Sequence, residues 1–188
     1  MILGGKIMTK PIRILLDMDG VLVDFSAQYE KINGKRPIEV YQPGSTPSPE
    51  KDRAWNRYVD QAGFEDAPLH EGALQLLCAV SNLVKEGRVS AVEICSSAGG
   101  KARQVDVTRQ KNVWLKLHDM DFMHAHIVQN GYKKAEVINL EKYHDILIDD
   151  TDRIVDNFRQ HGGFAILHTS VEDTVKQLEE LVDELSRD

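Results

Sequence analysis

Short apolar runs alternate with longer stretches of helical periodicity along most of the chain. The apolar runs are compact and rich in Val, Ile and Leu, which is typical of strands buried on both faces. Five such runs are predicted as strands, at 12–16, 89–95, 124–128, 145–148 and 164–167. Helices are predicted at 25–31, 49–61, 71–85 and 105–117, then through Ile154, Val155 and Phe158, and finally in an amphipathic segment with apolar positions from Val175 to Leu185. This alternation predicts an α/β fold, a doubly wound (Rossmann-like) parallel five-stranded sheet with helices on both faces.

The segment between the first two predicted strands is long and contains an irregular stretch. Pro37 and the residues PGSTPSP at 43–49 predict a loop that cannot continue a helix or a strand. The chain therefore leaves the core here. We interpret this part as an insertion into one domain rather than as a linker between two independent domains.

Composition and charge narrow the class of protein. The chain has 188 residues, of which 41% are hydrophobic and 28% charged, as expected for one globular domain with a modest insertion. A net charge of -7 argues against an extended nucleic-acid surface, although a mononucleotide or an oligonucleotide end fits it. Cys78 and Cys95 lack the spacing of a disulfide or zinc framework. With no apolar run of the roughly 20 residues that span a bilayer and no signal peptide, we expect a cytoplasmic protein without membrane contact.

Acidic residues follow two of the predicted strands. Asp17 and Asp19 stand in the turn DMDG after the first strand, and Asp149 and Asp150 end the fourth. In doubly wound sheets, ligands bind at the carboxyl ends of the strands, so these side chains are expected to meet. Two carboxylates from the first turn and a third from Asp149 or Asp150 form an oxygen site suited to Mg²⁺.

The same turn supplies groups for hydrolysis of a phosphate monoester. That reaction needs a nucleophile, a proton donor for the leaving oxygen and positive charge around the phosphoryl group. Asp17 can form an acyl-phosphate that water later hydrolyses. Asp19 can act first as general acid and then as general base.

Small and basic residues provide candidates for binding the phosphate. Ser96 and Ser97 follow the second predicted strand, and either can donate a hydroxyl and a backbone N–H to a phosphoryl oxygen. Lys133 and Lys134 stand side by side before the fourth strand. Either lysine can add a positive charge, and the sequence does not distinguish them.

Together these features resemble a known family. The residues DMDGV at 17–21, a strand ending in Ser96, a later lysine and a strand ending in Asp149-Asp150 are similar to the four ordered motifs of the haloacid dehalogenase (HAD) superfamily of phosphatases. The resemblance implies that Asp17 is the nucleophile and a ligand of Mg²⁺. It further implies that Asp19 is the acid/base residue whose carbonyl also binds the metal, that Asp150 is the remaining ligand, and that Asp149 supports it.

Further residues are similar to the 5'(3')-deoxyribonucleotidase branch of that superfamily. These are the sequences ICSS at 94–97 and LIDD at 147–150, and Gly63-Phe64 followed by Pro68, Gly72 and Ala73. This resemblance implies a small helical cap at 25–87, a core at 9–24 and 88–188, and Ser96 and Ser97 as the phosphate-binding pair. The expected substrate is a nucleoside monophosphate, with Phe25, Trp55 and Phe64 as candidates for a wall against the base. The oligomeric state stays open, a homo-oligomer included.

Other functions compete with this interpretation. Within the same chemistry, the substrate could instead be a 3'-phosphorylated nucleic-acid end or another small metabolite such as a sugar phosphate. A non-enzymatic phospho-acceptor module also uses a doubly wound sheet, an acceptor Asp and Mg²⁺, but it lacks an insertion after the first strand. A cysteine phosphatase built on Cys95 is disfavoured because Lys101 stands where a bidentate arginine is needed.

Overall fold

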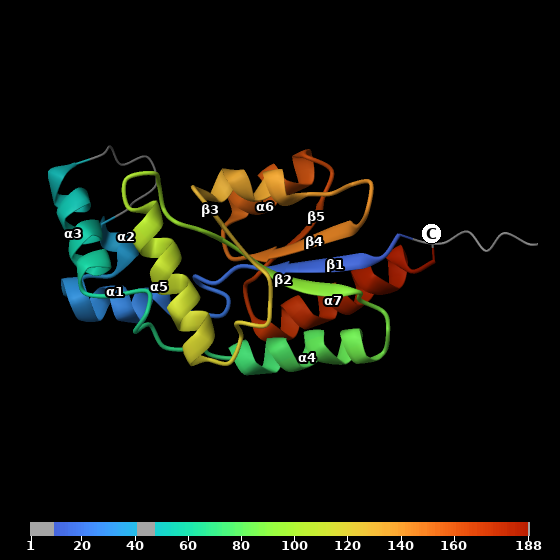
Figure 1. The fold of residues 1–188 in the computed structure, drawn as a ribbon. Coiled ribbons are helices and arrows are strands. Elements are labelled where there is room, and N and C mark those ends of the chain that lie inside the picture. Colours follow the sequence, from blue (N-terminus) through green and yellow to red (C-terminus); the bar gives the residue numbers. More distant parts are fainter. Residues whose placement is uncertain (1–9, 41–47, 188) are drawn as a thin grey trace, which may run out of the picture.

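A parallel sheet forms the centre of the molecule. The structure, a computed structural model, describes residues 10–40 and 48–187. Its five strands are β1 (Ile12–Leu16), β2 (Ala91–Ser97), β3 (Ala125–Val128), β4 (His144–Asp149) and β5 (Phe164–Leu167). They lie in the order β3-β2-β1-β4-β5, and all four pairings are parallel (Figure 1). The doubly wound sheet predicted from the sequence is therefore confirmed.

Helices cover both faces of this sheet. The described helices are α1 (Phe25–Asn33), α2 (Pro37–Val40), α3 (Pro49–Asp60), α4 (Ala73–Lys85), α5 (Gln104–Leu117), the 3₁₀ helix η1 (Gly131–Val137), α6 (Asp152–Gln160) and α7 (Val171–Leu185). Helices α1, α2 and α3 lie beyond the end of the sheet in Figure 1. Helices α4 and α7 lie below the sheet in Figure 1, and α6 lies above it. None of the helices within the described ranges combines the length and apolar character that a membrane span requires.

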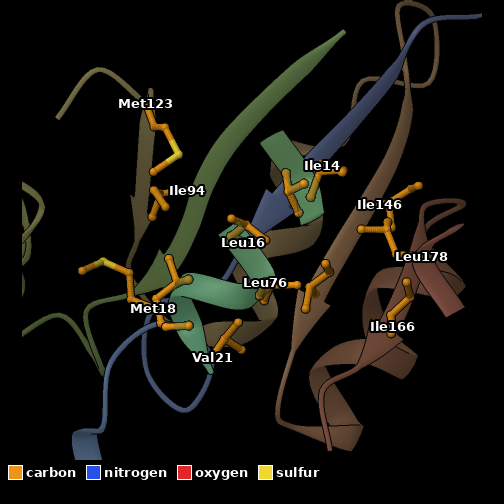
Figure 2. Packing of buried hydrophobic residues seen from close by; sticks show 14 of the residues in the cluster. Ile14, Leu16, Met18, Val21, Leu76, Ile94, Met123, Ile146, Ile166 and Leu178 are labelled. Carbon is orange, nitrogen blue, oxygen red and sulfur yellow. The ribbon is translucent and has the colours of Figure 1, made fainter. Parts of the chain in front are cut away.

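Two apolar clusters hold the layers together. The larger one joins alternate strand residues to α4, α5 and α7, and Figure 2 shows Ile14, Ile146 and Ile166 gathered with Leu76 of α4 and Leu178 of α7. The smaller cluster lies on the other face, between the sheet and α6. Each fully buried aliphatic side chain contributes about 1.5–3 kcal/mol relative to an exposed one, so both faces of β1 are firmly packed.

The second strand differs from its prediction. The sequence predicts it at 89–95, whereas β2 spans Ala91–Ser97. The difference arises because β3 continues the pairing, with Ser96 opposite Ile127 and Ser97 opposite Val128. Backbone hydrogen bonds to a neighbouring strand thus hold both serines in the sheet, although their side chains suggest a turn. Ser96 and Ser97 are the last two residues of β2.

The proline-rich segment is only partly the loop that was predicted. Pro37 begins the short helix α2, which a proline can do because the first N–H of a helix needs no partner within it. Pro49 begins α3 directly after Ser48, whose side chain accepts a hydrogen bond from the Lys51 N–H. Residues 43–47 lie outside the described residues.

The inserted segment contains a third apolar cluster. Tyr29 of α1, Tyr58 and Val59 of α3, and Phe64 are buried there together with Val107 of α5. By contrast, the buried residues of α4 belong to the larger sheet cluster. The division at 24 and 87 stays a prediction, while the packing associates α1 and α3 with the cap and α4 with the sheet.

Candidate active site

The turn after β1 is fixed by backbone hydrogen bonds. The Asp17 N–H donates to the Ile148 carbonyl of β4 over 3.0 Å, and the Met18 carbonyl accepts from the N–H groups of Val21, Leu22 and Val23. Gly20 has a φ of +78°, a left-handed conformation that favours glycine. A Cβ there would lie 2.1 Å from Oδ2 of Asp150, so the turn also needs glycine for space. These contacts hold the turn after β1 against the end of β4, so that their acidic residues are close together.

Three carboxylates meet at the carboxyl ends of β1 and β4. Asp17, Asp149 and Asp150 can each present an oxygen within 4.8 Å of the others. Asp149 is committed to protein partners, because its Oδ1 accepts from the Thr151 N–H over 2.9 Å and its Oδ2 from Lys134 over 2.6 Å. Within the described residues, Oδ2 of Asp17 and Oδ2 of Asp150 have no hydrogen-bond donor. This donor set of hard oxygens fits Mg²⁺.

Lys134 rather than Lys133 enters the cluster. Its Nζ lies 2.9 Å from Oδ1 of Asp17 and 2.6 Å from Oδ2 of Asp149, and the residue is only 2% exposed. Lys133 points to solvent and pairs with Glu136. The 3₁₀ geometry of η1 directs the two neighbouring lysines to opposite sides. The sequence did not distinguish them, and the structure places Lys134 in the cluster and Lys133 outside it.

Burial and crowding of negative charge shift the pKa values of the carboxyls. Burial, followed by the charge of Asp17, raises the pKa of Asp149. The same two causes, in the same order, raise the pKa of Asp150 to about 7. Burial lowers the pKa of Lys134, but the negative charges of Asp17 and Asp149 outweigh burial and raise this pKa above its ordinary value. The lysine is therefore cationic, and the carboxylates favour a further cation.

Asp19 is held by a lysine that the sequence did not single out. Lys111 of α5 is fully buried and donates to Oδ2 of Asp19 over 2.6 Å and to Oγ of Ser96 over 2.7 Å. The other carboxyl oxygen, Oδ1, is buried and has no hydrogen-bond partner among the described residues. Burial raises the pKa of Asp19, against the lowering effect of Lys111.

The two serines have different surroundings. Ser97 lines the cavity that opens above Asp17, whereas Ser96 is fully buried, lies outside that lining and binds Lys111. Because successive residues of a strand point to opposite faces, only one of the pair can face the cavity. Ser97 is therefore the serine placed to reach a phosphate in the cavity, and its binding of phosphate stays a prediction.

The aromatic residues predicted as a substrate wall also separate. Phe25 lines the cavity, but Phe64 is 2% exposed and does not. Its ring is enclosed by those of Phe25, Trp55 and Tyr58, with centroids 4.9–5.8 Å away. Trp55 packs over Gly99, where a Cβ would lie 2.5 Å from its ring. Phe64 and Trp55 thus pack behind the residues that line the cavity and do not line it themselves.

These groups surround a cavity of about 420 Å³. The strand ends contribute its acidic floor, and α1 contributes Phe25 and Ser26. The remaining wall comes from the start of η1 and of α6, including Tyr132 and Arg153. A cavity of this size suits a small molecule.

Cys95 is not part of this cavity. It is fully buried in the smaller apolar cluster, and burial raises the pKa of its thiol to about 12. A thiol with such a pKa is protonated and unreactive near neutral pH. The geometry therefore agrees with the sequence in disfavouring a cysteine phosphatase.

Three residues of the site were missed from the sequence. Lys111, Tyr132 and Arg153 all lie on helical segments, where a lysine, a tyrosine or an arginine is ordinarily a surface residue. Lys111 carried one weak signal, because it precedes Trp114 by three positions on a helix and so shares the buried face. Nothing in the sequence distinguishes Tyr132 and Arg153.

Comparison with known proteins supports the fold. No family model matches the sequence, and no curated protein matches it. Among solved structures, the chain is similar to a haloacid dehalogenase-like hydrolase from Streptococcus pneumoniae (TM-score 0.58, 15% identity, covering 85% of each chain). It is also similar to a HAD-hydrolase from Bacillus subtilis solved with bound magnesium (TM-score 0.54, 14% identity, 93% of this chain and 99% of that one). The chain thus has the fold of these hydrolases.

Proposed function

We propose that this protein is a Mg²⁺-dependent phosphomonoester hydrolase of the HAD type that acts through an aspartyl-phosphate on Asp17. The observation that carries the proposal is the bonding of Lys134 to both Asp17 and Asp149 beneath the cavity, next to carboxyl oxygens that have no hydrogen-bond donor within the described residues. This arrangement provides a nucleophile, a fixed positive charge and room for a metal at one point. The fold of the HAD hydrolases adds support.

Magnesium would be held by Asp17 and Asp150, with the Asp19 carbonyl as the further protein ligand that the HAD resemblance implies. When bound, it would neutralise the carboxylates and the phosphoryl oxygens, so that two anionic groups can approach. Asp149 would orient Lys134 through its 2.6 Å contact and would not be a principal ligand of the metal.

The chain's own residues then carry two displacement steps. A carboxylate oxygen of Asp17 attacks phosphorus, the bond to the ester oxygen breaks, and Asp19 gives that oxygen its proton. In the second step Asp19 takes a proton from water, and the resulting hydroxide displaces the Asp17 carboxylate and releases phosphate. Lys134 and Ser97 stabilise the charge on the phosphoryl oxygens.

The proposed substrate is a nucleoside monophosphate. A cavity of about 420 Å³ lined by Phe25 and Tyr132 offers aromatic surface for a base beyond the phosphate position. The net charge of -7 favours a small substrate over a long polymer. A sugar phosphate is the alternative within the same chemistry.

The test is phosphate release from 5'- and 3'-nucleoside and deoxynucleoside monophosphates, sugar phosphates and 3'-phosphorylated oligonucleotides. Each is measured with Mg²⁺ and with EDTA, for the wild type and for Asp17→Asn. We expect Mg²⁺-dependent turnover, fastest on nucleoside monophosphates, that EDTA and Asp17→Asn abolish. Lys133→Gln, which changes the neighbouring lysine outside the cavity, is the control and should leave turnover intact.

The panel also separates the competing functions. Turnover that persists in EDTA would exclude the metal-assisted mechanism. Preference for sugar phosphates would keep the mechanism and discard the nucleotide. A stable acyl-phosphate without turnover, detected by mass spectrometry, would favour the phospho-acceptor module.

A further inference from the structure

One cation of the cavity wall has no partner in the part of the chain that the structure describes. Two cationic side chains line the cavity, Lys134 and Arg153. Lys134 is paired with Asp17 and Asp149, and the proposed reaction uses it at the reacting phosphate. Arg153 is exposed and makes no ion pair or hydrogen bond with any residue in 10–40 or 48–187. The proposed reaction on the phosphate therefore leaves this guanidinium unused.

Packing of η1 on α6 brings Arg153 and an aromatic residue to the same cavity. Gly131 lies against Ile154, where a Cβ would be 2.6 Å from the Ile154 Cδ1. The Asn157 side-chain amide donates to the Tyr132 carbonyl over 3.0 Å and holds that loop to the same helix. Tyr132 is 53% exposed and lines the same cavity as Arg153. The two side chains thus form one wall of the cavity.

We infer that the site takes phosphomonoesters that carry a second phosphate group, which Arg153 binds while Tyr132 contacts the ring between the two. The inference rests on the proposed function and names its substrate class more narrowly. A guanidinium presents paired N–H groups that match two phosphate oxygens, and it stays charged at every working pH. A substrate with one phosphate leaves this group solvated and gains nothing from it.

The second phosphate can come from two sources. One is a free nucleoside bisphosphate, and the other is the next phosphate of an oligonucleotide with a terminal monoester. The net charge of -7 offers no extended basic track, so only the first additional phosphate is expected to matter. Affinity should accordingly stop rising once a second phosphate is present.

Steady-state kinetics with matched substrates test this inference. The wild type should have a kcat/KM for adenosine 3',5'-bisphosphate, or for a 5'-phosphorylated dinucleotide, about 10-fold or more above that for adenosine 5'-monophosphate. Arg153→Gln should lower the value for the bisphosphate at least about 10-fold more than the value for the monophosphate, and so remove this preference. Arg153→Lys should recover part of it, because the charge is kept but the paired geometry is lost. Arg187→Gln, an exposed arginine outside the cavity, is the control.

Binding provides a second readout that does not depend on turnover. Calorimetric titration of the Asp17→Asn variant with adenosine 3',5'-bisphosphate and Mg²⁺ should show tighter binding than the Asp17→Asn/Arg153→Gln double variant. The bisphosphate and the dinucleotide, compared in both assays, identify the source of the second phosphate.

Three outcomes would overturn the inference. An equal loss for mono- and bisphosphate in Arg153→Gln would assign the arginine to the reacting phosphate. Equal wild-type values, or equal binding by the two titrated variants, would show that no second phosphate is recognised. Absence of Mg²⁺-dependent turnover on every substrate is a different failure, that of the proposed function, and the calorimetric comparison still decides the role of Arg153.

Discussion

Two groups of charged residues lie on the same face of the sheet, one at each end of its strands. Arg13 and Asp17 are on alternate positions of the chain through β1, as are Asp145 and Asp149 through β4, so all four face the same side. A layer of Leu15, Cys95 and Leu147 separates the two groups. The same backbone therefore presents two polar networks whose local composition can be compared directly.

The network at the amino end is saturated in the sense that none of its buried side-chain oxygens or nitrogens lacks a partner within the described residues. Arg13 donates through Nε to Asp145 over 2.6 Å, through Nη1 to Glu93 over 2.9 Å and through Nη2 to the Val137 carbonyl over 2.9 Å. The second oxygen of Asp145 accepts from the Asn139 N–H over 2.6 Å. His126 adds a 2.7 Å contact to Glu93, and this contact and Arg13 lower the pKa of Glu93 although burial opposes them.

The network at the carboxyl end is unsaturated. Lys134 and Lys111 occupy some of its carboxyl oxygens, but the buried Oδ1 of Asp19 has no partner among the described residues. Its carboxylates also outnumber its lysines. A saturated network has no capacity for a ligand and serves the fold, whereas an unsaturated one is stable only with a further cation or proton. The difference distinguishes a structural ion cluster from a binding site.

The largest expected effect comes from Asp17→Asn. Turnover should fall by at least about 10³-fold because the nucleophile is lost, while the free energy of unfolding should not decrease, since one of several crowded carboxylates becomes neutral. Phosphate release and urea unfolding without Mg²⁺ measure the two quantities. A substantial loss of stability would show that the carboxyl end is as structural as the amino end.

Asp145→Asn should show the opposite pattern. Removing one charge from a buried pair leaves Arg13 only partly compensated, which costs about 3 kcal/mol of stability. Turnover per folded molecule should be unchanged, because the leucine layer separates this network from the cavity. Urea unfolding measures the loss of stability, and kcat measures turnover. The matched control is Asp183→Asn, which breaks an exposed pair with Arg88 and should cost below about 1 kcal/mol.

Lys111→Met tests whether holding Asp19 matters to the reaction. With Oδ2 fixed by Lys111, Oδ1 is the oxygen available to protonate the leaving group. We expect about a 10²-fold loss of kcat on an alkyl phosphate, which needs that proton, and a much smaller loss on dinitrophenyl phosphate, which does not. Equal losses on both would indicate a structural role only, and Lys116→Met on the exposed part of α5 serves as the control.

The smallest effect concerns the pH dependence of stability. His168 is 7% exposed, and the Nδ1 atom of its imidazole lies 2.8 Å from Oγ1 of Thr174. Burial, followed by the nearby His70, lowers the pKa of His168 below its ordinary value of about 6.5. The unfolded state then binds more protons in the interval between the two values, so stability is complete above about pH 6.5 and falls on acidification.

Replacing His168 removes that contribution. The free energy of unfolding of His168→Gln, measured in urea between pH 7.5 and 5.5, should decline less steeply than that of the wild type. The exposed His161→Gln should decline as the wild type does. Parallel slopes for all three proteins would contradict the assignment to His168.

The sheet and its acidic edge were predictable because both depend on local patterns. The runs at 12–16 and 164–167 match β1 and β5 residue for residue. Asp17 directly follows β1, Asp149 is the last residue of β4, and Asp150 follows it. Parallel strands bring their carboxyl ends together, so one rule converts sequence positions into neighbours in space.

The remaining features depend on contacts between distant segments. Which of Lys133 and Lys134 turns inward is decided by the 3₁₀ path of η1, and the extension of β2 through Ser97 is decided by pairing with β3. Phe64 resembles a substrate contact in sequence, yet three other rings enclose it. Neither periodicity nor motif spacing contains this information.

Gly20 has a consequence for how this site can vary. The space beside its Cα is occupied by the Asp150 carboxylate, 2.1 Å from where a Cβ would be, so the loop after β1 and the end of β4 are complementary surfaces. A side chain at position 20 would have to displace the carboxylate of Asp150, a candidate metal ligand, and would be strained at a φ of +78°. The glycine at position 20 and the placement of the Asp150 carboxylate therefore depend on each other.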